Sequence, residues 1–270
     1  MKIDGKKVAE EIIAWLKSKE TPQKILAAVL VGEDPTSISF VKQKEKAAGE
    51  LGVDFRIYNL SPELGNDGLR REVVRIAKQK PVGGVLVQLP LPGVINKHYI
   101  LNAVPPAKDV DVLGERALGA FYNNRNEVLP PAVETTREIL EVQKVELEKS
   151  VVAVIGLGAL VGRPISVWLT GKTKELHLLD EKSGLGILKE ADIVISGVGK
   201  GGLIKAEMLK SGAGVIDFGY YYTPDGKVLG DFDPAGADGV SFYTPTPGGT
   251  GPILVAKLIE NFYTLCKKQR

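Results

Sequence analysis

The chain has 270 residues, and its composition excludes several classes of protein. Apolar residues make up 44% of it and charged residues 25%, as in soluble globular proteins. The formal net charge of +2 indicates no preference for nucleic acids or anionic membranes. The single cysteine, Cys266, excludes a disulfide framework and a cysteine metal site within the chain. We therefore expect two domains, each with its own core, and no metal ion.

The N-terminal sequence and the apolar runs predict the compartment. The first residues, MKIDGKK, lack the apolar core of a signal peptide. No apolar run reaches the length needed to cross a bilayer. We therefore expect a cytosolic protein without a membrane or nucleic-acid partner.

The N-terminal part of the chain is expected to form a parallel α/β sheet. A helix begins after Asp4, with apolar residues at i, i+4 and i+8 from Val8. Three short apolar runs, closed by turn residues, predict strands over residues 24–31, 53–59 and 83–88. Helices are predicted over residues 36–51 and 67–78. This β-α-β-α-β order predicts parallel strands.

Two polar side chains in this part lie where a ligand site is expected. Lys44 falls on the same helix face as Phe40, Ala47 and Leu51. Gln88 ends the third predicted strand, at the edge of a parallel sheet where ligands bind. Taken alone, a helical lysine is more often a surface charge, and a strand-end glutamine can satisfy backbone groups. Both readings stay open at this point.

The segment from residue 151 to residue 180 has the pattern of a dinucleotide-binding unit. A strand over residues 151–155 enters Gly156-Leu157-Gly158, and a helix follows from about Gly162. Glycines there allow a pyrophosphate to approach the N-terminus of the helix. The next strand, residues 175–179, ends on Asp180, whose carboxylate can bind a ribose diol and repels a ribose phosphate.

The rest of the chain fits a cofactor domain. Strands are predicted over residues 192–196 and 213–218, the first followed by a glycine-rich loop suited to nicotinamide contacts. Asp109 and Asp111 can cap a turn, and Tyr220–Tyr222 are interpreted as a stacked surface or dimer contact. We place a hinge near residues 114–122 and expect the terminal helix, from Pro252, to pack on the first domain.

Six segments spread over nearly the whole chain occur in a characteristic order. They are IDGKKVAEEI (3–12), VGEDPTSISFVKQKEKA (31–47), GGVLVQLPLPGVI (83–95), KDVDV (108–112), VGRP (161–164) and YTPTPGGTGPILVAKLIEN (243–261). This combination resembles the bifunctional methylenetetrahydrofolate dehydrogenase/methenyltetrahydrofolate cyclohydrolase family.

The resemblance implies a fold and two activities. The expected α/β fold has an N-terminal α/β/α parallel-sheet catalytic domain, residues 1–118 with helix 250–270, and a Rossmann-type NAD(P)-binding domain, residues 119–249, with a cleft between them. The implied reactions are oxidation of 5,10-methylenetetrahydrofolate to the methenyl form with NAD(P)+ and its hydrolysis to 10-formyltetrahydrofolate. The implied assembly is a homodimer formed through the cofactor domains.

The resemblance also implies the site residues. Lys44 matches the catalytic lysine, Gln88 the glutamine that hydrogen-bonds it, and Asp111 the aspartate that grips the pterin edge. A lysine can relay protons only if burial lowers its pKa from about 10.4. The implied folate contacts are Phe40, Lys44, Gln88, Leu89, Pro90, Asp111, Pro247, Gly248 and Gly249. The expected cofactor contacts are Gly156, Leu157, Gly158, Val161, Gly162, Arg163, Pro164, Asp180, Gly197, Val198, Gly199, Asp217 and Gly219.

The chain departs from the family pattern around the folate site. Phe40 replaces the usual tyrosine, so a hydroxyl relay is lost. Val112 replaces a glycine, and we expect that turn to differ because valine does not readily adopt positive φ. The segment 130–133, PPAV, lacks the threonine of a PCTP-type sequence. These changes bear on the cyclohydrolase activity more than on the dehydrogenase activity.

The cofactor segment departs as well. Leu157 and Gly158 stand where family members often carry Arg-Ser, and Asp180 adds a like charge, so NAD is favoured over NADP. Arg163 or Lys182 is the alternative partner for a 2′-phosphate. Three other functions are kept as alternatives: a dehydrogenase-only member of the family, a shikimate dehydrogenase-like enzyme, and a non-catalytic cofactor-binding descendant.

Overall fold

The computed structural model describes residues 1–269, which form two compact units. The five-stranded unit comprises Met1–Glu11 and Ala132–Leu254. The three-stranded unit comprises Ile12–Pro131 and the chain from Val255 onward. The units divide the chain within helices α1, Gly5–Lys17, and α8, Thr250–Lys267, and after Pro131. The segment expected as a hinge forms a helix, α5, Glu115–Tyr122, which lies inside the three-stranded unit.

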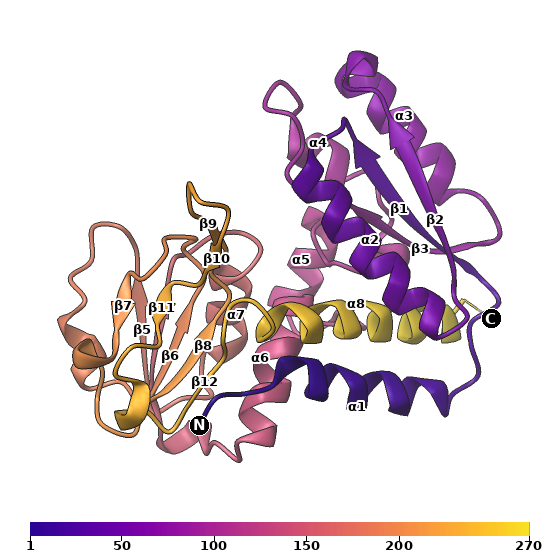
Figure 1. The fold of residues 1–270 in the computed structure, drawn as a ribbon. Coiled ribbons are helices and arrows are strands. Elements are labelled where there is room, and N and C mark those ends of the chain that lie inside the picture. The colour runs from indigo at the N-terminus through magenta and orange to yellow at the C-terminus, as the bar shows by residue number, and fades with distance from the viewer. Residues whose placement is uncertain (270) are drawn as a thin grey trace. The chain divides into compact units, whose positions relative to one another are not determined.

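The three-stranded unit has the predicted parallel sheet (Figure 1). Its strand order is β2-β1-β3, with β1 at Ile25–Val31, β2 at Asp54–Leu60 and β3 at Val82–Val87. Helices α2, Pro35–Glu50, and α3, Gly65–Ala77, connect these strands. Every residue of the central strand β1 is buried, because a parallel strand covered on both faces exposes no side chain to water. The expected β-α-β-α-β order is confirmed.

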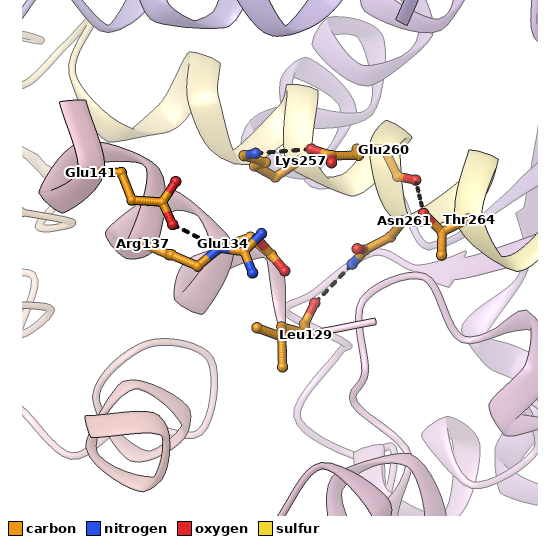
Figure 2. Close-up of polar contacts among 8 residues, drawn as sticks. All are labelled: Leu129, Glu134, Arg137, Glu141, Lys257, Glu260, Asn261 and Thr264. Carbon is orange, nitrogen blue, oxygen red and sulfur yellow. Dashed lines mark hydrogen bonds and ion pairs between the residues drawn. The ribbon is translucent and has the colours of Figure 1, made fainter. Parts of the chain in front are cut away.

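The C-terminal part of α8 belongs to the core of this unit. The Asn261 amide donates to the carbonyl oxygens of Val110, at 2.9 Å, and Leu129, at 2.8 Å; Figure 2 shows the second of these bonds. Phe262 is fully buried, and a Cβ added at Gly84 of β3 would lie 2.7 Å from its ring. The glycine therefore lets α8 approach the strand closely. Shorter helices complete the unit, among them α4, Lys97–Leu101.

The five-stranded unit is a Rossmann-type sheet, also as predicted. All neighbouring strands are parallel, in the order β12-β8-β6-β4-β5. The bounds are β4 Val151–Ile155, β5 Glu175–Leu179, β6 Ile193–Ser196, β8 Gly214–Asp217 and β12 Phe242–Tyr243. The chain moves outward from β4 to β5 and then returns to β6 on the other side of β4. This reversal of direction creates the crevice in which open α/β sheets bind ligands.

Two helices and two small sheets complete the five-stranded unit. Helix α6, Pro131–Val142, precedes β4 and carries Arg137, which pairs with Glu134 at 2.6 Å and Glu141 at 3.7 Å (Figure 2). Helix α7, Gly162–Leu169, follows β4. One small sheet pairs β7, Ile204–Lys205, with β11, Phe232–Asp233. The other pairs β9, Tyr221–Tyr222, with β10, Val228–Leu229.

The N-terminus is joined to the same unit by backbone hydrogen bonds. The Ile3 N–H donates to the Tyr243 carbonyl at 2.8 Å, and the Tyr243 N–H donates to the Met1 carbonyl at 2.9 Å. Asp4 then caps α1, accepting hydrogen bonds from the N–H groups of Lys6 and Lys7, as the sequence predicted. Among the described residues, no helix has the length and apolarity needed to span a membrane.

Candidate active site

Lys44 and Gln88 meet at the carboxyl end of β3. Lys44 lies on α2, and its Nζ donates to Gln88 Oε1 at 2.9 Å. The other end of the Gln88 amide donates to the Leu89 carbonyl at 2.6 Å, which fixes the oxygen toward the lysine. The Gln88 side chain is buried, with 6% of the residue exposed, whereas Lys44 is half-buried. A neutral acceptor therefore holds the amine in place without adding a negative charge.

Asp111 is within electrostatic reach of this pair. Burial raises the pKa of its carboxyl by disfavouring the charged form, and the positive charge of Lys44 offsets part of that effect. The structure thus brings together the three side chains proposed for catalysis, all of them in the three-stranded unit. They come from α2, from the end of β3 and from the turn that follows Lys108.

Asp109 holds the turn that carries Asp111. Its Oδ2 accepts hydrogen bonds from the N–H groups of Leu113, at 3.0 Å, and Gly114, at 2.8 Å. The carboxyl is almost fully buried, and burial raises its pKa from 3.8 to about 6 against the lowering effect of these donors. From the sequence, Asp109 was expected only to cap a turn. In the structure its side chain binds backbone up to Gly114, five residues further along the chain.

The expectation for Val112 was wrong. Val112 adopts φ of +56° while its side chain is fully buried. Positive φ is costly for a β-branched residue and persists only where the surroundings impose it. Here the Val112 N–H bonds the Asp109 carbonyl, and the next two N–H groups bond the Asp109 side chain. The turn is therefore kept despite the loss of glycine.

The remaining expected folate contacts lie nearby in sequence or in the other unit. Phe40 lies one helical turn before Lys44 and is half-buried, as is Leu89, whereas Pro90 is exposed. Pro247 is exposed in the five-stranded unit, and Gly248 beside it has φ of +95°. At Gly249 an added Cβ would lie 2.4 Å from the Pro245 carbonyl oxygen. The tight course of this loop therefore requires glycine at both positions, 248 and 249.

The glycine turn after β4 has the close packing expected of a dinucleotide site. Gly156 has φ of +82°, and a Cβ at Gly162 would lie 1.9 Å from the Gly156 carbonyl oxygen. A Cβ at Gly197, in the loop after β6, would lie 2.7 Å from Val161. The loops after β4 and β6 therefore touch at the reversal of strand order, where only glycine fits. Around them, Leu157 and Val161 are half-buried, Pro164 is buried, and Gly158 and Arg163 are exposed.

Asp180 is exposed at the end of β5, where a ribose-binding acid is expected. Its Oδ1 accepts hydrogen bonds from the Ser183 hydroxyl and the Lys182 N–H, both at 2.9 Å. These donors lower the pKa of the Asp180 carboxyl, so it is ionised at neutral pH. The position and charge fit a ribose diol.

Asp217 occupies a different place from the one expected. It is 1% exposed, and its carboxylate accepts hydrogen bonds from the N–H groups of Gly219, at 2.6 Å, and Phe232, at 2.9 Å. Burial raises its pKa to about 7, with a contribution from the nearby Asp231. Asp217 therefore organises backbone behind the site rather than contacting a ligand.

No site role is predicted for Asp231 from the sequence, and the residue is fully buried. Its carboxylate accepts three hydrogen bonds from N–H groups of the loop that follows β6, including Val198 and Gly199 at 2.7 and 2.9 Å, and a fourth from the hydroxyl of Ser196 at the end of β6. No local pattern signals this role, because the donors lie 31 to 35 residues earlier in the chain.

Threonine hydroxyls tie the C-terminal glycine loop to the end of β8. Thr250 donates to the Asp217 carbonyl at 2.9 Å, and Thr246 donates to the Gly219 carbonyl at 3.2 Å. The Gly5 N–H bonds the Gly248 carbonyl at 3.1 Å. A cavity of about 380 Å³ adjoins the loop; its lining includes Lys2, Gly202, Gly230, Thr246 and Pro247. The loop is thus anchored at its ends and adjoins open space.

These features define a class of protein. One unit carries a parallel sheet with a dinucleotide-type glycine turn and an ionised acid after the second strand. The other carries a lysine, a glutamine and an aspartate beyond the end of a parallel strand. The combination is typical of a two-domain α/β dehydrogenase.

Comparison with known proteins gives the family. Residues 3–111 match the model of the tetrahydrofolate dehydrogenase/cyclohydrolase catalytic domain, and residues 130–270 match the model of its NAD(P)-binding domain. The chain is similar to the bifunctional protein FolD of Helicobacter pylori strain J99, with 35% identity over 99% of this chain and 96% of that protein. The chain therefore belongs to the tetrahydrofolate dehydrogenase/cyclohydrolase family, as the sequence motifs predicted.

Solved structures agree with this assignment. The bifunctional enzyme FolD from Campylobacter jejuni has a TM-score of 0.92 and 31% identity, covering 100% of this chain and 99% of that one. The FolD of Trypanosoma brucei, complexed with NADP and an inhibitor, has a TM-score of 0.93 and 28% identity, covering 99% and 97%. Family membership excludes the shikimate dehydrogenase-like alternative.

Proposed function

We propose that this chain oxidises 5,10-methylenetetrahydrofolate to the methenyl form with a nicotinamide dinucleotide and hydrolyses the methenyl form to 10-formyltetrahydrofolate. The observation that carries the proposal is the 2.9 Å hydrogen bond between Lys44 and Gln88, with Asp111 in electrostatic reach. The proposal is supported by the resemblance of these three side chains to the family's catalytic set and by the match of the chain to both family domains.

Lys44 is the proton carrier of the hydrolysis. Water adds to the methenyl carbon and releases a proton, which the Lys44 amine carries. A proton then passes from the amine to the folate nitrogen as its bond to that carbon breaks, and the hydroxyl on the carbon releases its proton to solvent as the formyl carbonyl forms. Gln88 accepts one hydrogen bond from the amine and so holds it in position. Phe40 contributes only a ring face, since it has no hydroxyl to extend the relay.

The hydride step makes fewer chemical demands on the chain. The dinucleotide, when bound, supplies the hydride acceptor, and the protein aligns the two partners. Asp111, as a carboxylate, would accept two adjacent N–H donors of the pterin. The Gly156–Gly162 turn and the loop after β6 offer the close backbone approach that a dinucleotide needs. No residue is assigned a proton transfer in this step.

NAD is proposed as the preferred dinucleotide. Asp180 is exposed and ionised at the end of β5, where it would repel a ribose phosphate. Leu157 and Gly158 provide no cation in the turn after β4. Titration with NAD and with NADP distinguishes the two, and tighter binding of NADP would reverse the assignment.

The chain is also proposed to act as a homodimer formed through its five-stranded units. Tyr220, Tyr221 and Tyr222 are each 39 to 48% exposed beside Leu229, which is 42% exposed. The Tyr220 and Tyr222 rings meet edge to face at 5.2 Å. An exposed aromatic group of this kind is typical of a protein interface. Light scattering on the purified protein tests this directly, and a monomer at micromolar concentration would exclude it.

Two absorbance assays test the proposed function. One follows the appearance of methenyltetrahydrofolate from the methylene form with NAD, and the other follows its disappearance by hydrolysis. Both activities are expected. Dehydrogenase activity without hydrolysis would favour the dehydrogenase-only form, which is consistent with the missing hydroxyl at Phe40. The absence of both activities would leave the non-catalytic alternative.

A further inference from the structure

The loop after β6 forms a concave array of backbone N–H groups, and Asp231 fills it. Its Oδ1 accepts from Gly199, at 2.9 Å, and Lys200, at 2.7 Å. Its Oδ2 accepts from the Val198 N–H, at 2.7 Å, and the Ser196 hydroxyl, at 2.6 Å. Three consecutive N–H groups thus converge on one carboxylate, with Gly199 at φ of +79°. Such an array is a binding site for an anion.

The surrounding structure is built to keep the carboxylate there. The residue is fully buried, and a Cβ at Gly219 would lie 2.3 Å from Asp231 Oδ1. The Ile204 N–H bonds the Asp231 carbonyl at 2.8 Å, and the Phe232 N–H bonds Asp217 at 2.9 Å. Contacts within the protein therefore hold the backbone on both sides of Asp231.

The occupied array decides which face the loop offers to a cofactor. In a trans peptide the N–H and the preceding carbonyl point in opposite directions. With the N–H groups of residues 198–200 turned toward Asp231, the carbonyls of residues 197–199 turn away from it. Although its glycines resemble those of a phosphate site, the loop presents carbonyl oxygens to a ligand, because its N–H groups bond Asp231. These oxygens repel a phosphate and can accept hydrogen bonds from a neutral donor.

We propose that Asp231 is a positioning residue for dinucleotide binding: by filling the N–H array of residues 198–200, it directs the loop carbonyls to the carboxamide N–H donors of the nicotinamide. The inference rests on the proposed function, because it assumes that the loop after β6 faces the nicotinamide end. It adds a role for a buried acid that does not touch the ligand itself.

The test compares wild type with Asp231→Asn in dinucleotide binding and in methenyl hydrolysis, which needs no dinucleotide. The amide offers one acceptor and places two hydrogens toward donors, so the loop loses half of its bonds. Affinity for NAD, measured by fluorescence titration, is expected to fall by about tenfold or more. The hydrolysis rate should stay within about threefold, because Lys44 and Gln88 lie in the other unit. A folded variant with unchanged affinity would overturn the inference.

Two further measurements keep the inference falsifiable if Asp231→Asn does not fold. In wild type, the amides of residues 198–200 should be protected from hydrogen exchange without dinucleotide, and rapid exchange would overturn the inference. In Asp231→Ala, sodium formate should restore NAD affinity by refilling the array, whereas sodium chloride of equal ionic strength should restore less. Equal recovery with both salts would indicate a general effect on stability and count against a positioning role. Failure of wild type to bind any dinucleotide would instead remove the proposed function.

Discussion

Replacing Asp109 by asparagine should change the pH dependence of stability while leaving the turn intact. The Asp109 Oδ2 accepts both local N–H bonds, from Leu113 and Gly114, and an asparagine carbonyl oxygen can take its place. Burial raises the pKa of Asp109 from 3.8 to about 6, so the folded protein holds a proton that the unfolded chain releases. The free energy of unfolding therefore falls as the pH rises through this window and levels off above about pH 6.

The size of the effect follows from the same shift. About two pKa units correspond to about 3 kcal/mol for this group when both titrations are complete. Between pH 4.5 and 7.5 the free energy of unfolding of Asp109→Asn, relative to wild type, should rise by about 2 kcal/mol. Taking the difference between the two proteins cancels the titration of the other groups.

Urea unfolding of the two proteins at several pH values measures this difference. Asp238→Asn, which changes an exposed carboxylate, serves as the matched control for the substitution itself. If the difference between Asp109→Asn and wild type stays constant with pH within about 0.5 kcal/mol, the buried carboxyl does not hold the proton assigned to it.

Three further predictions concern activity. Gln88→Ala removes the acceptor of the Lys44 amine and should slow methenyl hydrolysis about tenfold or more, with a smaller effect on methylene oxidation; equal losses in the two assays would argue against a role in orienting the amine. Phe40→Tyr restores a hydroxyl one turn before Lys44 and should raise the hydrolysis rate severalfold without changing the KM for folate; a lower rate would show that the chain has adapted to the missing hydroxyl. Asp180→Ser removes the charge at the end of β5 and should improve NADP affinity relative to NAD about tenfold; an unchanged ratio would place the discrimination elsewhere.

The regular elements could be predicted because buried strands appear in the sequence as short apolar runs between turn residues. The strands at residues 151–155 and 175–179 have the predicted bounds, and β1 begins one residue later than expected. The two-residue strands β7, β9, β10, β11 and β12 were not predicted. They are too short to show a periodicity, and their pairing depends on the neighbours that tertiary structure supplies.

The site was less predictable because its contacts join distant parts of the chain. Helical spacing placed Lys44 on an apolar face, but its bond to Gln88, 44 residues away, was expected only from the family resemblance. Asp231 and Asp217 show the limit more clearly, since, apart from the Ser196 hydroxyl, the donors to their carboxylates are backbone N–H groups, which carry no side-chain signal. Val112 shows the converse: a local preference against positive φ is outweighed by the bonds that Asp109 makes to the turn.

The most direct test of the account is Lys44→Met, with the exposed Lys46→Met on the same helix as its control. Methenyl hydrolysis should fall about a hundredfold or more in the first variant, because the proton carrier is lost. Methylene oxidation should persist at a reduced rate, since the hydride step needs alignment rather than the amine. Lys46→Met should keep both activities. Hydrolysis at the wild-type rate in Lys44→Met would contradict the assignment of this amine, and with it the proposed catalytic site.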